Sequence, residues 1–273
     1  DAYDGVSAMP MTPQVQSGLP VIERTDGVVT VTLNRADQHN RLDPADIDAL
    51  AVLLDDIRDE LSTVPTALRS LVLRGSGSRT FCSGFTISAI GNQLDERFER
   101  MLDKLEALPI PTIAAIQGGV YGGGTDLALC CDIRLGVEDA RMFMPAARFG
   151  IHYYSGGLRR YVRNLGLAAS KKLFLTGMEI GAAEMLRIGF LTEVVEASEL
   201  DVRVAGYLRS IAATEGGVVA SMKDHLHRFA EGCPNLKEAD RVARASVKSE
   251  ASRLRLAQLG TARAAGDVPA KTC

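Results

Sequence analysis

The stretch VYGGGTDLALCCDI, residues 120–133, decides the fold of this chain. A short apolar run ends in three consecutive glycines, Gly122 to Gly124, and a second apolar run follows directly. The pattern predicts a strand that enters a tight turn from which a short helix opens. The first N–H groups of such a helix are unpaired and lie at the positive end of its dipole. We therefore expect the turn to hold an oxygen that carries negative charge.

The two nucleotide-binding loops that use such a turn do not fit. A P-loop needs Lys followed by Ser or Thr after its last glycine, whereas Thr125-Asp126 stands here, and Asp126 would repel a phosphate. The dinucleotide fingerprint needs glycines at i, i+2 and i+5, and neither Gly118 nor Gly122 begins such a series. What remains is an oxygen that becomes an oxyanion during a reaction.

A second turn of small residues lies upstream, in RTFCSGFTISAI, residues 79–90. Ser83-Gly84 follows a predicted strand, and a further helix could open at Phe85 to Ile87. Because an oxyanion hole normally has two N–H donors, the pair of turns favours one. Either turn taken singly could equally serve close packing of a strand against a helix.

The segments around these turns alternate between strand and helix patterns. Residues 20–34 predict a hairpin turning at Asp26-Gly27, and residues 43–61 predict a helix with Asp43 as N-cap and Pro44 as first residue. Further strands are expected in 68–77, 112–121 and 133–139, and further helices in 98–108 and 125–132. Such alternation implies parallel crossovers and an α/β core.

The chain is expected to divide into a flexible leader, residues 1–18, a core, residues 19–201, and a helical C-terminal subdomain, residues 202–273.

Composition narrows the classes of function. The chain has 273 residues, 46% hydrophobic and 24% charged, which is typical of a globular protein, and a net charge of -3 leaves no basic excess for nucleic acid. No apolar stretch is long enough to span a membrane, so we expect no membrane partner. Five cysteines without CxxC spacing predict free thiols, and no pattern predicts a bound metal. These features predict a cytoplasmic protein.

Four segments in order resemble the crotonase, or enoyl-CoA hydratase/isomerase, superfamily. They are VTVTLNRADQHNRLDPADIDAL (29–50), FCSGFTI (81–87), PTIAAIQGGVYGGGTDLALCCDIRL (111–135) and the stretch that begins FGIHYYSGG (149–196). The resemblance implies a spiral of ββα repeats with a C-terminal helical trimerisation subdomain, hence a homotrimer or homohexamer. It also implies a lyase or isomerase of fatty acid metabolism that acts on an acyl-CoA thioester, with coenzyme A as part of the substrate and no tightly bound cofactor.

Carried over by position, the resemblance assigns a role to particular residues. The N–H groups of Phe85 and Gly123 would form the oxyanion hole that stabilises a thioester enolate, and Asp126 would be the acid/base. The coenzyme A adenine would lie near the backbone of a short strip that comprises Cys82, Ser83, Gly84 and Ile87.

Two departures from the family pattern concern the reaction. Hydratases of the family use two glutamates, and this chain has Asp126 at the first position and Ala146 at the second. A single carboxylate favours double-bond isomerisation, in which one base moves one proton. Alternatively, Asp126 only caps its own helix. Tyr153 aligns with a tyrosine of the methylmalonyl-CoA decarboxylase-like members, so it could orient a substrate carboxylate in a decarboxylase, or it could only wall the pocket.

Further departures concern coenzyme A. Family lysines that meet its phosphates correspond to Asp37 and Ser88, and Lys223 is a candidate replacement. A hydrolase of cyclic diketones that does not use coenzyme A therefore stays an alternative. A non-catalytic acyl-CoA-binding subunit is another.

Overall fold

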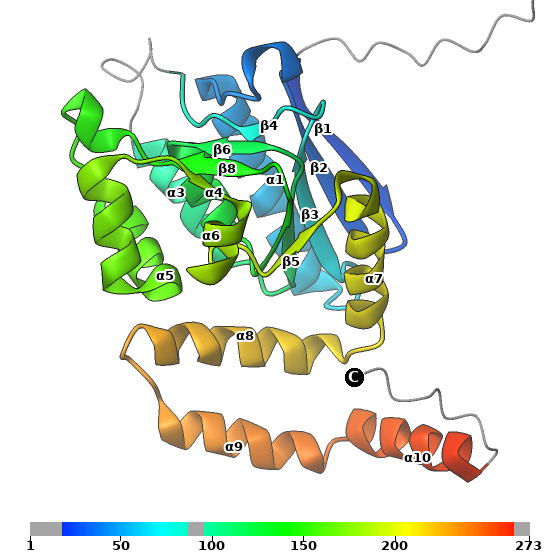
Figure 1. The fold of residues 1–273 in the computed structure, drawn as a ribbon. Coiled ribbons are helices and arrows are strands. Elements are labelled where there is room, and N and C mark those ends of the chain that lie inside the picture. The colour runs from blue at the N-terminus through cyan, green and yellow to red at the C-terminus, as the bar shows by residue number, and fades with distance from the viewer. Residues whose placement is uncertain (1–17, 87–95, 265–273) are drawn as a thin grey trace, which may run out of the picture.

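The computed structural model of the protein describes residues 18–86 and 96–264 (Figure 1). Two sheets form its body. The larger sheet has the order β1 (Gly18–Thr25), β2 (Val28–Asn34), β3 (Ser70–Gly75), β5 (Thr112–Ile116), β7 (Ile133–Val137) and β10 (Glu193–Val195). The smaller has the order β4 (Thr80–Cys82), β6 (Gly119–Tyr121), β8 (Arg141–Phe143) and β9 (Ile180–Gly181). Only the pairs β1–β2 and β8–β9 are antiparallel among these described strands. The expected α/β class with parallel crossovers is confirmed.

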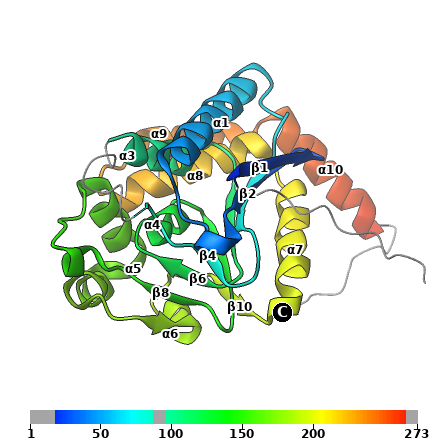
Figure 2. The same ribbon diagram turned by 90° about the horizontal axis from the view of Figure 1, so that it is seen from above.

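Helices connect and cover the strands. In the described body they are η1 (Ala36–Gln38), α1 (Pro44–Thr63), α3 (Glu96–Glu106), α4 (Gly123–Leu129), η3 (Ala146–Phe149), α5 (Ser155–Thr176), α6 (Ala182–Arg187), η4 (Ala197–Glu199) and α7 (Leu200–Ala212). Figures 1 and 2 both place α5 at one end of the body and the β1–β2 hairpin at the other. The short helix α4 packs against β4, β6 and α5, and α3 packs against α1 and α5.

Local sequence explains the first elements. Asp26 and Gly27 have φ of 51° and 76°, the positive values that a tight hairpin turn needs, and β1 pairs with β2 around them. The α1 helix begins at Pro44, and the Asp46 carboxylate accepts a hydrogen bond from the Asp43 N–H at 2.8 Å. The predicted hairpin and helix start are both confirmed.

The core is built from parallel strands that are covered on both faces. All five residues of β5 are buried, and four of them form the apolar run Ile113 to Ile116. Such uninterrupted apolar runs are typical of parallel strands between layers of helices. The buried strands therefore fix where their carboxyl ends, and the turns that follow them, meet in space.

One expected helix is corrected. Phe85 pairs with Leu42 in an isolated parallel bridge, and Thr86 donates its N–H to the Leu42 carbonyl. The segment therefore begins as extended chain, because its backbone groups find partners on the neighbouring loop. The remainder of the expected helix, including Ile87, lies outside the described residues.

The C-terminal helices form a separate layer below the body in Figure 1. They are α8 (Gly216–Ala230), α9 (Leu236–Val247) and α10 (Glu250–Ala264). Exposed apolar side chains lie along all three: Met222, Leu226, Phe229, Leu236, Val247, Leu254 and Leu256. Lys223 of α8 donates a hydrogen bond to the Asp132 carboxylate at 2.7 Å, and its side chain is only 10% exposed. This ion pair joins α8 to the body, so Lys223 is not a free cation at the surface.

Candidate active site

The two small-residue turns meet backbone to backbone. Gly84 has φ of +82°, and a Cβ on it would lie 2.6 Å from the Gly123 nitrogen and 3.0 Å from the Tyr121 carbonyl oxygen. Gly122, at the start of α4, has φ of +51°. Neither conformation suits a residue with a side chain. The glycines thus let the segment before Phe85 contact the start of α4.

This contact places two N–H groups close together. A Cβ on Gly123 would lie 3.6 Å from the Phe85 nitrogen. Within the described residues, neither the Phe85 nor the Gly123 N–H donates a hydrogen bond to the protein. Both residues line a cavity of about 910 Å³. Two unpaired donors at one point of a cavity wall are the arrangement that an oxyanion requires.

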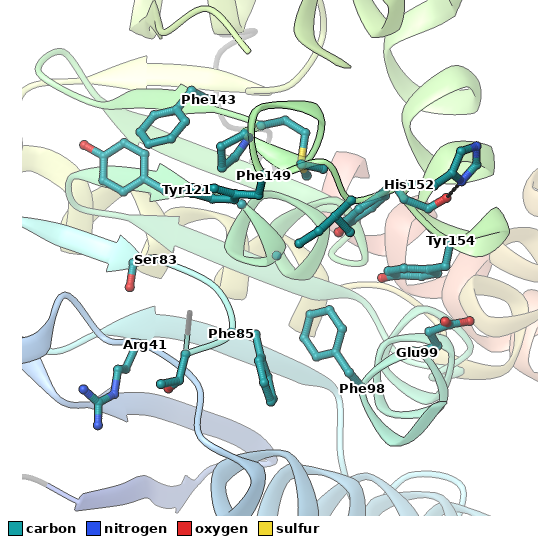
Figure 3. A pocket seen from close by; sticks show the side chains of 18 of the residues that line it. Arg41, Ser83, Phe85, Phe98, Glu99, Tyr121, Phe143, Phe149, His152 and Tyr154 are labelled. Atoms are coloured by element: carbon teal, nitrogen blue, oxygen red, sulfur yellow. Dashed lines mark hydrogen bonds between the residues drawn. The ribbon is translucent and has the colours of Figure 1, made fainter. Parts of the chain in front are cut away.

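Several aromatic rings line the cavity (Figure 3). Its aromatic lining residues are Phe85, Phe98, Tyr121, Phe143, Phe149, Tyr153 and Tyr154. Phe98 packs against both turns, because its ring lies 6.4 Å from that of Phe85 and its Cζ atom is 2.9 Å from where a Cβ on Gly123 would stand. The region next to the two N–H groups is therefore walled by apolar rings.

Asp126 lies behind this wall. Its side chain is 0% exposed and it is absent from the residues that line the cavity. Arg160 of α5 donates to it through Nε at 2.8 Å and through Nη2 at 3.3 Å. The hydroxyls of Tyr153, at 3.3 Å, and of Tyr154 also donate to its Oδ2 atom. Both carboxylate oxygens are thus occupied by donors from the protein.

Tyr153 and Tyr154 separate Asp126 from the cavity. Both line the cavity and both turn their hydroxyls to Asp126. Burial, and then the charge of Asp126, raises the pKa of each phenol, so both stay protonated donors. The predicted site residue Tyr153 is therefore at the cavity, with its ring available to a ligand and its hydroxyl engaged.

Arg160 belongs to an interlocked set of charges between α3 and α5. Asp103 and Glu106 of α3 receive hydrogen bonds from Arg160 at 2.8 and 3.4 Å, and Glu106 is also held by Arg159 at 2.7 Å and by Arg163. Burial would raise the pKa of Glu106, but the three arginines outweigh it and lower that pKa. The set fixes α3 against α5 on one side of the cavity.

Glu99 begins the same acidic stripe of α3, one turn before Asp103, and lines the cavity. Figure 3 shows it beside Phe98, at the end of the cavity where Phe98 and Tyr154 meet. Within the described part of the chain it has neither an ion pair nor a hydrogen bond from its side chain. Burial, reinforced by the charges of Asp103 and Glu96, raises its pKa.

The predicted coenzyme A strip is partly at the cavity. Ser83 lines it, whereas Cys82 is fully buried and accepts a hydrogen bond on Sγ from the Gly84 N–H at 3.3 Å. Ile87 lies outside the described residues. Arg41 also lines the cavity, with its side chain 39% exposed and paired to Asp43.

Ala146 lines the cavity from η3 and is buried. It adds only a methyl group to the wall, so this position offers no acid to a substrate. His152 also lines the cavity, and its Nδ1 contacts the Tyr153 carbonyl oxygen at 2.8 Å.

Three residues at or behind the cavity escaped the sequence analysis. Arg160 and Glu99 sit in helices where charged residues are common, and Arg41 lies in a loop. The one available signal was the apolar spacing of Phe98 and Met101 on α3, which places Glu99 at the border of the buried face.

Comparison with known proteins assigns the family. A model of the enoyl-CoA hydratase/isomerase family matches residues 23–253. The short-chain-enoyl-CoA hydratase of Clostridium acetobutylicum is 32% identical over 187 residues, covering 66% of this chain and 70% of that protein. The crotonyl-CoA hydratase of Syntrophomonas wolfei is 30% identical over 189 residues, covering 66% of this chain and 70% of its own length. The chain belongs to the enoyl-CoA hydratase/isomerase family.

Solved structures of enoyl-CoA hydratases have the same fold as this chain. An enoyl-CoA hydratase from Bacillus anthracis superimposes with a TM-score of 0.79 at 26% identity, covering 90% of this chain and 97% of that one. A protein from Magnetospirillum magneticum, described as an enoyl-CoA hydratase/carnithine racemase, gives 0.80 at 26% identity, covering 93% and 96%. The crotonase fold expected from the resemblance is confirmed.

The described residues include neither a membrane-spanning helix nor a cluster of metal ligands. None of their helices combines the length and apolarity that crossing a membrane requires. No group of three or more His, Cys, Asp or Glu side chains among them could hold a metal ion.

Proposed function

We propose that this protein is an acyl-CoA-processing enzyme of the enoyl-CoA hydratase/isomerase type. In this proposal the Phe85 and Gly123 N–H groups hold the thioester oxygen while an enolate forms at the α-carbon. The observation that carries it is the close contact of the two turns, which places on one cavity wall two N–H groups that donate to no other described residue. Donors that are oriented in advance stabilise the developing charge without reorganising, which is how such holes accelerate reactions.

Isomerisation fits the cavity better than hydration does. Hydration needs one group to position water and another to deliver the α-proton. Ala146 contributes no acid to the wall, and the Asp126 oxygens already accept hydrogen bonds from Arg160 and the two tyrosines. Moving a double bond from the 3- to the 2-position needs only one base.

The side chains that line the cavity favour an apolar acyl group and a carrier that bears phosphate. Seven aromatic side chains line the cavity, and these favour an apolar acyl group. Among the described residues that line the cavity, Arg41 is the arginine that supports a phosphate-bearing carrier, in place of the lysines that the family has at the positions of Asp37 and Ser88.

We further propose that the protein assembles as a homotrimer or homohexamer. The exposed apolar side chains along α8, α9 and α10 support this, because such patches on a monomer usually mark a contact surface.

Substrate assays test the proposed reaction. Purified protein is given crotonyl-CoA, a 3-enoyl-CoA and methylmalonyl-CoA, and products are followed by mass spectrometry. We expect conversion of the 3-enoyl-CoA to the 2-enoyl-CoA. Decarboxylation of methylmalonyl-CoA alone would instead identify a decarboxylase, and thioester binding without any turnover or α-proton exchange would identify a binding subunit.

A further inference from the structure

Asp126 and Glu99 are the two carboxylates that could move the substrate proton in the proposed reaction, and they differ in their access to the cavity. Asp126 is completely buried, is absent from the cavity wall and accepts hydrogen bonds on both oxygens. For it to take a proton from a substrate, Tyr153 or Tyr154 would have to move aside and a buried ion pair would have to be disturbed. The hydrogen bonds from Tyr153, Tyr154 and Arg160 fix the Asp126 carboxylate as the partner of the Arg160 guanidinium.

Two acids lie on the described wall of the cavity, Glu96 and Glu99. The Glu96 side chain is 82% exposed and pairs with Arg100, one turn along the same helix. Glu99 is partly buried, and no arginine or lysine pairs with it among the described residues. It is therefore the acid of this wall that combines burial with freedom to bind and release a proton.

Glu99 and the two N–H groups belong to the wall of one cavity, and Phe98 lies between α3 and the two turns. Phe98 contacts the rim of the turn at Gly123 and packs on Phe85, so the start of α3 faces the same region of the cavity. Figure 3 shows the Glu99 side chain at the end of this region, beside Phe98 and next to Tyr154. In the proposed function, a thioester whose oxygen is held by the two N–H groups would extend its acyl carbons along this aromatic wall.

We infer that Glu99 is the catalytic carboxylate that moves the substrate proton and that Asp126 is a positioning residue which acts through Arg160 and the two tyrosines. This inference rests on the proposed function, and it names the base of the same site.

The proposed step moves one proton from the α-carbon to the γ-carbon of the substrate. The carboxylate of Glu99 takes the α-proton of a 3-enoyl thioester, and the electron pair of the broken C–H bond forms a dienolate. The negative charge on the thioester oxygen is held by the Phe85 and Gly123 N–H groups. Protonated Glu99 then returns the proton to the γ-carbon, which gives the 2-enoyl thioester and restores the carboxylate.

The surrounding charges suit this role. Asp103 and Glu96 on its own helix and Asp126 on α4 oppose ionisation of Glu99, Arg160 on α5 favours it, and burial is the largest influence. The resulting pKa lies above the ordinary glutamate value, which makes Glu99 a better proton acceptor than an exposed glutamate.

Exchange of α-protons measures the first half of this step. Full-length protein is incubated with butyryl-CoA in deuterated water, and deuterium uptake is followed by mass spectrometry. We expect Glu99→Gln to slow exchange by about 100-fold or more while the dissociation constant of butyryl-CoA changes only a few-fold. Glu138→Gln, an exposed glutamate on the turn between β7 and β8, is the matched control and should leave exchange unchanged.

Asp126→Asn and a pH series complete the test. We expect Asp126→Asn to lower the melting temperature while the folded fraction still exchanges protons. The rise of the wild-type exchange rate with pH should be lost in Glu99→Gln and regained in part by Glu99→Asp.

Two results would overturn the inference, and they differ. Wild-type exchange that persists undiminished in Glu99→Gln removes the role of Glu99 and leaves the proposed function standing. A wild type that neither binds butyryl-CoA nor exchanges its protons removes the proposed function, and the inference with it.

Discussion

At the scale of single residues, the site depends on backbone that has no room for side chains. Gly84 combines φ of +82° with a Cβ position 2.6 Å from the Gly123 nitrogen, so any side chain there must push the two turns apart. The two N–H groups are then separated, although neither belongs to the substituted residue. The site is therefore sensitive at a position that contributes no chemistry of its own.

Gly84→Ala tests this dependence. We expect the proposed turnover to fall by about 100-fold or more, the effect of losing one donor from an oxyanion hole. Gly232→Ala is the matched control, because Gly232 also has positive φ (72°) but meets nothing within 4 Å. The control should cost about 1 kcal/mol of stability and leave turnover unchanged. Equal turnover in the two variants would contradict the role of the contact.

At the scale of elements, α3 and α5 are joined by buried and partly buried charges. Glu106 is 8% exposed at its side chain and is held by Arg159, Arg160 and Arg163. Because its pKa in the folded protein is lowered, protonation favours the unfolded chain. The stability that Glu106 contributes is therefore present above its ordinary pKa of 4.5 and is lost as the pH falls through the lowered value.

Glu106→Gln should reveal this contribution. At about pH 7 we expect the variant to lose about 3 kcal/mol in its free energy of unfolding, because three arginines lose a buried partner. On acidification to about pH 3 the gap to the wild type should narrow. Glu60→Gln, which removes an exposed pair with Arg24, should cost only about 0.5 kcal/mol, and denaturant titrations measure both. If the difference in unfolding free energy between Glu106→Gln and the wild type grew on acidification, the pKa of Glu106 would not be lowered in the folded protein.

At the scale of the whole molecule, the body and the C-terminal helices differ in how they bury apolar surface. The body has a continuous core, whereas none of the residues of α8 or α9 is buried. In the proposed trimer or hexamer these helices complete their packing against other copies of the chain. Their stability would then depend on protein concentration.

Leu226→Asp tests the proposed assembly. Light scattering should give the wild type a mass of three or six chains of 29.2 kDa each, and the variant a smaller mass, because a charge is placed on an apolar contact. Val52→Asp, at an equally apolar and 60% exposed position on α1, should leave the mass unchanged. A wild type that is monomeric at every concentration would remove the proposal.

Most of the fold could be predicted from local patterns. Asp26-Gly27, Asp43-Pro44 and the glycine run each determine a turn or a helix start through backbone preferences that need no distant partner. The conformation of Phe85 could not be predicted from local patterns. The residues around it permit a helix, but its backbone lies against Leu42, which is distant in sequence, and it is extended there.

The sequence by itself determined the family, the parallel α/β core and the positions of the two small-residue turns, because glycine spacing and apolar periodicity act over a few residues. The tertiary structure alone decided which carboxylate faces the cavity. Asp126 follows the glycine run, yet packing of α4 against α5 pairs it with Arg160 and closes it off with Tyr153 and Tyr154. Glu99 reaches the cavity from another helix and has no ion pair within the described residues. Packing between segments that are distant in sequence decides which charges are paired.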